Sequence, residues 1–244
     1  MVKIIASIFS IVLCSAAAYS QEYEVDKFDT GDGKELEITF VGHGSLVFKY
    51  DGNVIHIDPS SREADYETMN DADLILITHH HGDHCNPDAV DKIKTDDTKI
   101  ISTQLSVDKL GLGTVLPNGE STDFKNINIE AIPAYNLVHT RDNGEFYHPK
   151  GTCNSYVLTI GNKRIFIGGD TENTPEMKAL ENIDIAFLPM NLPYTMTPEM
   201  VADAAKAFKP KILYPYHYGK TDTSIIVSLM KDEEEVETRM RNMP

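Results

Sequence analysis

The sequence is poor in basic residues. It contains 22 lysines and arginines against 38 aspartates and glutamates, which gives a formal net charge of −16. The first twenty residues contain one lysine and no acidic residue, so the rest of the chain has 21 basic residues against 38 acidic ones and a net charge of −17. Such a surface repels phosphate backbones and anionic lipid headgroups. The charge therefore argues against nucleic acid as a partner.

Long apolar runs are absent after residue 20, so we expect no stable insertion into a membrane. The first twenty residues differ from the rest: Lys3 precedes an apolar stretch at 4–13, and the small residues 15–18 follow it. This is the pattern of a secretory signal peptide. We predict cleavage before Gln21 and a mature protein that is secreted or periplasmic.

Cysteine is scarce, with three in the chain. Cys14 lies in the leader, and anchoring as a lipoprotein is disfavoured because the preceding Leu13 is large where lipid attachment needs a small residue. Cys85 and Cys153 remain, in a compartment where disulfides can form. Both fall in loops that we place near the functional site, so pairing is conceivable. We favour two free, buried thiols.

Four potential metal ligands lie in one heptapeptide, Thr78–His84 (THHHGDH). Just before it, Asp73–Thr78 (DLILIT) is a continuous apolar run typical of a strand buried on both faces. The ligands offered are His79, His81, Asp83 and His84. Three imidazoles and a carboxylate suit zinc or another borderline first-row metal. Without a cation, burying these groups would cost roughly 1–3 kcal/mol each unless they found other partners. The pattern therefore predicts a metal site.

The apolar pattern also predicts a unit that occurs twice. Strands at 47–50 and 54–57 flank Asp51-Gly52, and strands at 156–160 and 164–168 flank Gly161-Asn162, as in two β-hairpins. Each hairpin leads to an aspartate, and a buried strand opens fourteen or fifteen residues later. The aspartates are Asp58 and Asp170, and the strands open at Asp73 and Asp184. We therefore predict two similar halves packed face to face, an α/β fold with four αββα layers, in one domain over 21–244.

Other segments fill in this plan. We expect further strands at 36–41, 99–102, 126–132, 183–188 and 212–216, with a short last strand after the acidic run 232–235. We expect one helix of about eight residues that begins at Asn86-Pro87, a second at 175–180, and a third from Thr197-Pro198 to about Phe208. A long loop covers 133–154, and long loops inside a compact domain are usually functional.

These motifs together resemble the metallo-beta-lactamase fold hydrolases. The HxHxDH turn, the strand-ending aspartates, a histidine in the middle loop and the late His217 occur in that family's order between residues 36 and 220. The resemblance implies the same αββα sandwich and two divalent metal ions, with zinc favoured. It also implies catalysis by a metal-activated hydroxide on a carbonyl or phosphoryl group.

The resemblance also implies a role for each matching residue. His79, His81 and a third histidine would bind the first metal, and Asp83, His84 and His217 the second. Asp170 would bridge the two metals, Asp83 would also orient the hydroxide, and Asp58 would hold a ligand imidazole in its tautomer.

Four shorter stretches resemble the ascorbate-6-phosphate lactonase-like branch: FVGHGSL, HPKG, GGDT and PYHYG. In the first of these, His43 is expected to face the substrate as a catalytic residue, and a packed loop histidine is the alternative. We also expect Tyr135, Asn136 and Tyr194 to line the pocket.

The third ligand of the first metal has two candidates, His139 and His148. His139 lies in the polar stretch HTRDNGE, whose Asp142-Asn143-Gly144 indicates an exposed turn. His148 lies on the return limb of the loop before Pro149, which biases it towards an extended backbone. We therefore predict His148.

The sequence favours an exported zinc-dependent hydrolase acting on a small ester, a lactone or a related small molecule. The alternatives are a phosphodiesterase on the same dinuclear site and a non-catalytic metal-binding protein. A processing nuclease would need a basic surface, and a redox di-iron scaffold would need a carboxylate at position 81.

Overall fold

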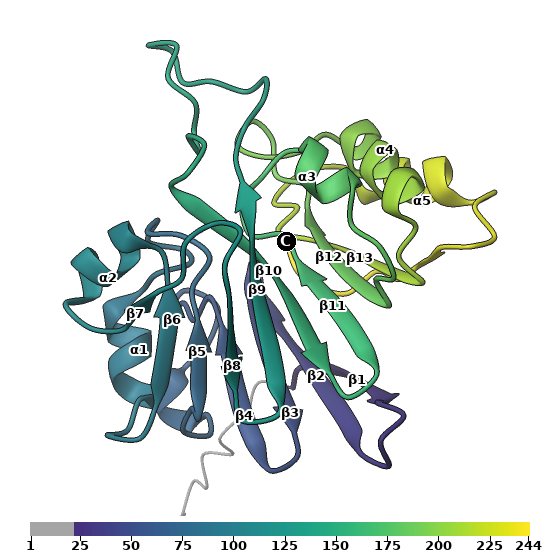
Figure 1. The fold of residues 1–244 in the computed structure, drawn as a ribbon. Coiled ribbons are helices and arrows are strands. Elements are labelled where there is room, and N and C mark those ends of the chain that lie inside the picture. Colours follow the sequence, from purple (N-terminus) through teal and green to yellow (C-terminus); the bar gives the residue numbers. More distant parts are fainter. Residues whose placement is uncertain (1–21) are drawn as a thin grey trace, which may run out of the picture.

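The computed structural model describes residues 22–244 and contains two seven-stranded sheets that lie face to face, with helices on their outer sides (Figure 1). This is the predicted αββα sandwich. The predicted leader over residues 1–20 lies outside the described residues. None of the helices described over 22–244 is long and apolar enough to cross a membrane.

The two sheets have the same internal pattern. The first has the order β1 to β7: β1 (Glu24–Asp29), β2 (Glu35–Gly42), β3 (Ser45–Tyr50), β4 (Asn53–Ile57), β5 (Leu74–Leu76), β6 (Lys99–Ser102) and β7 (Thr114–Val115). The second runs from β8 to β14: β8 (Ser121–Phe124), β9 (Ile127–Ala134), β10 (Cys153–Ile160), β11 (Lys163–Ile167), β12 (Ile185–Pro189), β13 (Ile212–Tyr216) and β14 (Glu237–Thr238). In each sheet the first four strands pair antiparallel and the last three join in parallel. The repeated unit predicted from the sequence is therefore present.

Turn chemistry fixes both predicted hairpins. Asp51 and Gly52 between β3 and β4 have φ angles of 51° and 75°, and two consecutive positive values define the type I′ turn that matches the twist of paired strands. Gly161, which begins the second turn, has φ 56°. A two-residue loop there sets Ile160 opposite Lys163. Asp58 directly follows the second strand of the first hairpin, and Asp170 follows that of the second hairpin after Gly168 and Gly169.

Three helices begin at a capped proline, as predicted. They are α1 (Pro87–Ile93), α3 (Pro175–Lys178) and α4 (Pro198–Phe208). The side chains of Asn86, Thr174 and Thr197 each accept a hydrogen bond from a backbone N–H in the first turn. This satisfies a donor that has no partner inside the helix.

Several elements were not predicted: the edge strands β1, β7 and β8, a short 3-10 helix η1 (Tyr66–Thr68), α2 (Gln104–Leu110) and α5 (Thr223–Met230). In Figure 1, α1 and α2 cover the first sheet, and α3, α4 and α5 cover the second.

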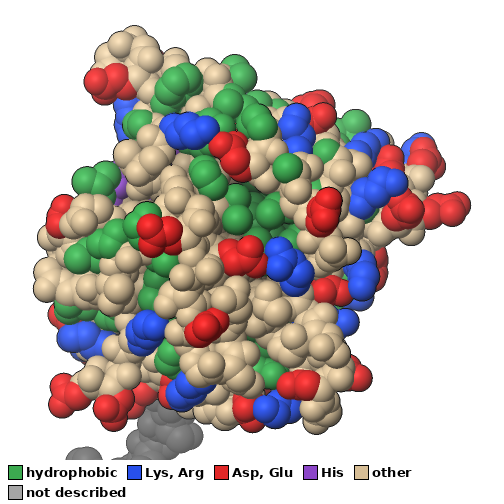
Figure 2. Space-filling view, in the orientation of Figure 1, with side chains coloured by type: hydrophobic (Ala, Val, Ile, Leu, Met, Phe, Trp, Pro, Cys, Tyr) green, Lys and Arg blue, Asp and Glu red, His purple; other side chains and the backbone are tan. Residues whose placement is uncertain are grey.

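The core lies between the sheets. Phe40 from the first sheet packs against Phe187 and Tyr214 from the second, with ring centroids 6.1 and 5.0 Å apart. On the face shown in Figure 2, acidic and basic side chains are interspersed, without a continuous basic patch among the described residues on that face.

Candidate metal centre

Two groups of potential ligands meet at one end of the sandwich, where strands from both sheets end. In each group, the ligand atoms lie within 4.8 Å of one another. The first group contains His79, His81, His148 and Asp170, and the second contains His43, Asp83, His84 and His217. These residues are far apart in the sequence. They come together because strands of both sheets end at this edge of the sandwich.

In the first group, three imidazoles converge through one nitrogen each. His79 Nε2 lies 3.1 Å from His81 Nδ1, and His148 Nε2 lies 3.3 Å from the same His81 atom. The other nitrogen of His79 faces the hydroxyl of Thr78 at 3.1 Å. That hydroxyl donates to Asp58, so it accepts from His79 Nδ1 and leaves Nε2 as an unprotonated ligand atom.

The second group is built around two stacked imidazoles. His84 and His217 are 4.9 Å apart between ring centroids, and their Nε2 atoms are 3.0 Å apart. Asp83 Oδ2 lies 3.9 Å from His217 Nε2 and 3.3 Å from His43 Nε2. The ring of His43 packs on that of His217, with centroids 3.6 Å apart. His43 is therefore both a packed histidine and part of the ligand group.

Asp170 lies between the two groups with one oxygen toward each. Oδ1 is 3.3 Å from the Nε2 atoms of both His84 and His217, and Oδ2 is 3.2 Å from His148 Nε2 and 3.8 Å from His79 Nε2. Burial opposes ionisation of this carboxyl, but His217 and His84 hold its pKa well below the ordinary range. Each oxygen can therefore serve one ligand group.

Asp58 is hydrogen-bonded to both ends of the turn Thr78–His84. It is fully buried, and its oxygens accept hydrogen bonds from the Thr78 N–H and hydroxyl, both at 2.7 Å, and from His84 Nδ1 at 2.8 Å. A protonated Nδ1 fixes the tautomer in which Nε2 of His84 points toward Asp170. This is the geometry expected for Asp58 from the sequence.

Backbone strain is concentrated at this site. Three of the seven non-glycine residues with positive φ among the described residues lie here: His43 at 51°, Asp58 at 46° and His217 at 46°. Such conformations cost of order 1–3 kcal/mol each and persist where the surroundings impose them. Gly44 follows His43, and a Cβ at that position would lie 2.7 Å from His84 Cε1. The FVGHGSL stretch therefore needs glycine there so that the chain can pass close to the imidazole.

The chemistry of the donor set fits two divalent metal ions. Nitrogen lone pairs and carboxylate oxygens point inward in two groups, and the remaining imidazole nitrogens of His79, His84 and His148 each have a partner on their outer side. The buried Oδ1 of Asp170 has no hydrogen-bond partner within the described chain. Imidazole nitrogens facing one another at about 3 Å gain little without a cation, whereas a divalent metal ion bound by nitrogen and oxygen ligands would satisfy them.

The structure brings His148 into the site and keeps His139 out of it. Nδ1 of His139 lies 2.6 Å from Oε1 of the buried Glu172. His148 is buried, and its backbone N–H and Nδ1 both contact Oδ1 of Asn136, at 2.8 and 2.9 Å. His139 belongs to neither ligand group, and the contact with Glu172 holds its side chain there.

Glu172 was missed by the sequence analysis. Its carboxylate accepts hydrogen bonds from the backbone N–H groups of Leu137, Val138 and His139 at 2.6 to 2.8 Å, and from the Asn136 amide at 3.0 Å. Burial raises the pKa of Glu172, but these donors outweigh it and hold the pKa below its ordinary value. The available signal was its position two residues after Asp170 in the GGDTE stretch.

Two residues predicted to line the substrate pocket lie elsewhere. Tyr135 donates its hydroxyl hydrogen bond to Glu176 at 2.8 Å, and Lys150 sits 4.5 Å above its ring, away from the ligand groups. Asn136 is buried and links Glu172 to His148. Neither residue is therefore among those that line the pocket over the two ligand groups. Tyr194 does line the pocket, as predicted.

A pocket of about 440 Å³ opens over the two ligand groups. Its lining includes His43, His81, Asp83, His148, Asp170 and His217, together with Arg62, Arg141, Tyr147, Asn191 and Tyr194. This volume suits a small molecule. Cys85 and Cys153 are both free and buried, as favoured from the sequence.

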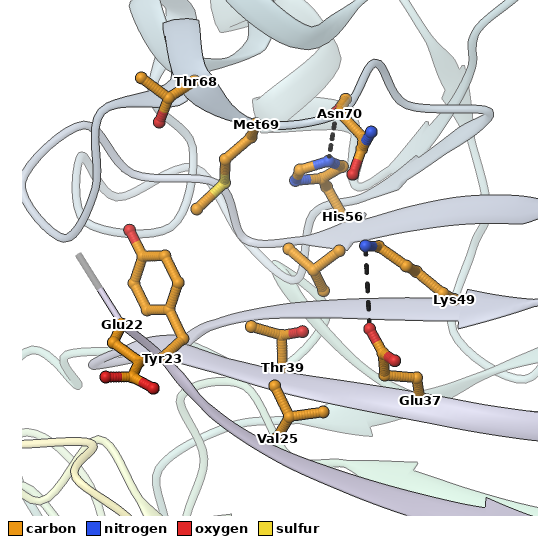
Figure 3. A pocket seen from close by; sticks show the side chains of 11 residues that line it. Glu22, Tyr23, Val25, Glu37, Thr39, Lys49, His56, Thr68, Met69 and Asn70 are labelled. Atoms are coloured by element: carbon orange, nitrogen blue, oxygen red, sulfur yellow. Dashed lines mark hydrogen bonds and ion pairs between the residues drawn. The ribbon is translucent and has the colours of Figure 1, made fainter. Parts of the chain in front are cut away.

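A second hollow, of about 630 Å³, lies on the outer face of the first sheet and contains neither ligand group (Figure 3). Its deepest titratable residue is His56, which is 1% exposed. His56 Nε2 donates to the Asn70 carbonyl at 3.0 Å, and Nδ1 has no partner within residues 22–244. Burial, aided by the charge of Lys49, lowers the pKa of His56 to about 4.

His56 should make the protein less stable in mild acid. Its pKa is about 4 when folded and about 6.5 when unfolded, so the unfolded chain takes up a proton first as the pH falls. Between pH 7 and pH 5 the free energy of unfolding should therefore fall by about 2 kcal/mol more in the wild type than in His56→Gln. Urea unfolding of both metal-free proteins at the two pH values measures this difference. Parallel pH profiles would contradict it.

Comparison with known proteins agrees with this geometry. A family model described as "Beta-lactamase superfamily domain" matches residues 37–217. A UPF0173 metal-dependent hydrolase of Thermococcus onnurineus is 31% identical over 198 residues, which cover 75% of this chain and 85% of the relative. A relative of the same name from Ligilactobacillus salivarius is 32% identical over 195 residues, with 75% and 85% covered. The crystal structure of a metal-dependent hydrolase from Parabacteroides distasonis is 49% identical, covers 91% of this chain and 100% of its own, and has a TM-score of 0.88.

Proposed function

Because this chain belongs to the metallo-beta-lactamase superfamily, and within it to the UPF0173 metal-dependent hydrolases, we propose that it is an exported zinc-dependent hydrolase of small esters or lactones. The observation that carries the proposal is the pair of ligand groups sharing Asp170 at the floor of a pocket of about 440 Å³. The relatives are named as metal-dependent hydrolases without a substrate. The ester or lactone preference rests on the sequence motifs and on the acidic surface.

The residues divide into three roles. His79, His81 and His148 would hold one metal, Asp83, His84 and His217 the other, and Asp170 would hold both. When bound, two such ions lower the pKa of a water molecule from 15.7 to roughly 7 and polarise the scissile carbonyl.

Asp83 and His43 act at the pocket floor. Asp83 Oδ2 accepts a hydrogen bond from the attacking water and aims it at the carbonyl carbon. His43 Nε2, 3.3 Å from Oδ2, steadies this carboxylate. The other His43 nitrogen is fixed by the Pro244 carbonyl at 2.8 Å. His43 therefore cannot turn away without losing a contact.

A substrate panel tests the reaction class. We expect the zinc-loaded protein to hydrolyse at least one lactone or carboxylic ester and to lose this activity on treatment with a chelator. Readdition of zinc should restore it. Rapid hydrolysis of phosphodiester reporters without any action on lactones or esters would favour the phosphodiesterase alternative. Tight metal binding without hydrolysis of any probe would favour a non-catalytic metal-binding protein.

Export is tested separately. Protein recovered from the periplasm or the medium of expressing cells should begin at Gln21, because small residues precede that position and an apolar core precedes them. Mass spectrometry of the exported chain measures its N-terminal residue. An intact Met1 would contradict the prediction.

A further inference from the structure

Among residues 22–244, two arginines that line the pocket lack an acidic partner. Arg62 and Arg141 both line the pocket, and within residues 22–244 neither guanidinium forms an ion pair. The chain's other arginines each bind a carboxylate: Arg164 binds Glu130 at 2.9 Å, Arg239 binds Glu237 at 2.7 Å, and Arg241 binds Asp26 at 2.6 Å. The chain has 38 acidic residues that could pair with an arginine, yet both guanidinium groups without such a partner line the pocket.

Arg141 is held in place although it is exposed. Its guanidinium lies 4.9 Å from the ring centroid of Tyr147, which packs edge-on against Tyr194 at 5.0 Å. Its backbone closes a tight turn, with N–H donating to the Glu145 carbonyl at 2.7 Å. Stacking occupies the face of a guanidinium and leaves its N–H donors free in the plane. Arg141 can therefore bind an anion without first being ordered.

Arg62 lies beside the metal-binding turn. Its Nη2 is 3.8 Å from the position that a Cβ on Gly82 would take. Gly82 immediately precedes Asp83, so this guanidinium is close to one ligand group, while Arg141 reaches the pocket from the long β9–β10 loop. A guanidinium presents paired donors that match the two oxygens of a carboxylate or phosphate.

We propose that the substrate carries one compact anionic group, a carboxylate or a phosphate monoester, which Arg62 and Arg141 bind while the scissile ester or lactone lies over Asp170. This rests on the proposed function and narrows its substrate class. The net charge of −17 in the chain after residue 20 repels large polyanions. The two guanidinium groups make the pocket locally positive, which favours a small anion there.

Matched esters test the proposal on the zinc-loaded protein. The probes are neutral 4-nitrophenyl pentanoate, mono-4-nitrophenyl glutarate, and the 4-nitrophenyl ester of 4-phosphonooxybutanoate. We expect kcat/KM to be at least about tenfold higher for one anionic ester than for the neutral one. The preferred anion identifies the carboxylate or the phosphate class.

Arg62→Gln and Arg141→Gln should each reduce that preference about tenfold, mainly through KM. Arg164→Gln, which removes a guanidinium outside the pocket, should leave it intact. A wild type without preference for either anion, or variants that lose activity equally on all three esters, would overturn the proposal.

A binding experiment separates this proposal from the proposed function. Calorimetry of glutarate and of inorganic phosphate, with neutral glutaramide as comparator, needs no turnover. If neither the wild type nor any variant hydrolysed an ester, the proposed function would be rejected. The calorimetry would still show whether the two arginines bind an anion. We expect the double variant Arg62→Gln/Arg141→Gln to bind one of the two anions at least about tenfold more weakly than the wild type. Equal anion affinity in both proteins would show that the metals alone hold the anion, and would overturn the proposal.

Discussion

Asp170→Ala is expected to lower kcat/KM by roughly 10³-fold or more, while the protein stays folded. The carboxylate places one oxygen against His84 and His217 and the other against His148, so its removal takes a ligand from both groups at once. The bound metal should fall from two ions to one or fewer per chain. Metal analysis, steady-state kinetics and circular dichroism on the same preparation measure all three quantities.

Asp203→Ala provides the control for the loss of a carboxylate. Asp203 lies on α4 and pairs with Lys178 at 3.1 Å on the surface, a contact worth about 0–1 kcal/mol. This variant should keep both its metal and its activity. Two bound metals in Asp170→Ala would show that the ligand groups fill independently and that Asp170 does not join them.

Much of the fold could be predicted because its signals are local. The apolar run DLILIT and the turn residues Asp51-Gly52 specify strands and a hairpin within a few residues of chain. The repeated spacing from hairpin to aspartate to buried strand reflects two sheets with the same order of antiparallel and parallel pairs. These local patterns were therefore enough to predict the layers of the sandwich and the strand ends at which the ligands lie.

The missed elements have weak signals. The strand β1 (EVDKFD) is an edge strand with mostly charged or half-exposed residues, so its apolar alternation is short. The helix α2 has seven residues and buries only Ser106, and α5 buries Ile226 and Met230 alone. Short helices with so narrow a buried face derive their stability from tertiary contacts rather than from a readable pattern.

The parts of the site that could not be predicted depend on distant contacts. His43 contacts Asp83, 40 residues away, and Pro244, 201 residues away. Tyr135 and Asn136 are adjacent, yet one turns toward Glu176 and the other toward His148. Sequence separation gives no information on such choices, because the folded sheets decide which side of the loop each residue faces.

Glu172→Gln is expected to weaken metal binding by roughly 10–100-fold. Glu172 acts on the ligand His148 indirectly, through Asn136. One Glu172 oxygen accepts from Leu137 and Val138, and the other from Asn136 and the His139 N–H. In glutamine an NH₂ group replaces one of these oxygens. Two of the N–H groups that now donate to Glu172 would then face another N–H donor and lose their hydrogen bonds. Asn136 would then shift, and with it the hydrogen bond that fixes the tautomer of His148.

Glu176→Gln is the matched control for this last variant. Glu176, on α3, also accepts hydrogen bonds from this loop, from the Tyr135 hydroxyl at 2.8 Å and the Lys150 ammonium at 2.8 Å. Within residues 22–244, neither of these bonds continues to His148. Competition with a chromophoric chelator gives the affinity, and the visible spectrum of the cobalt-substituted protein reports the ligand geometry independently of activity. We expect Glu172→Gln to change both and Glu176→Gln to change neither. If both variants lowered thermal stability alike while metal affinity and the cobalt spectrum stayed at wild-type values, Glu172 would be a structural anchor of the loop without influence on the metal centre.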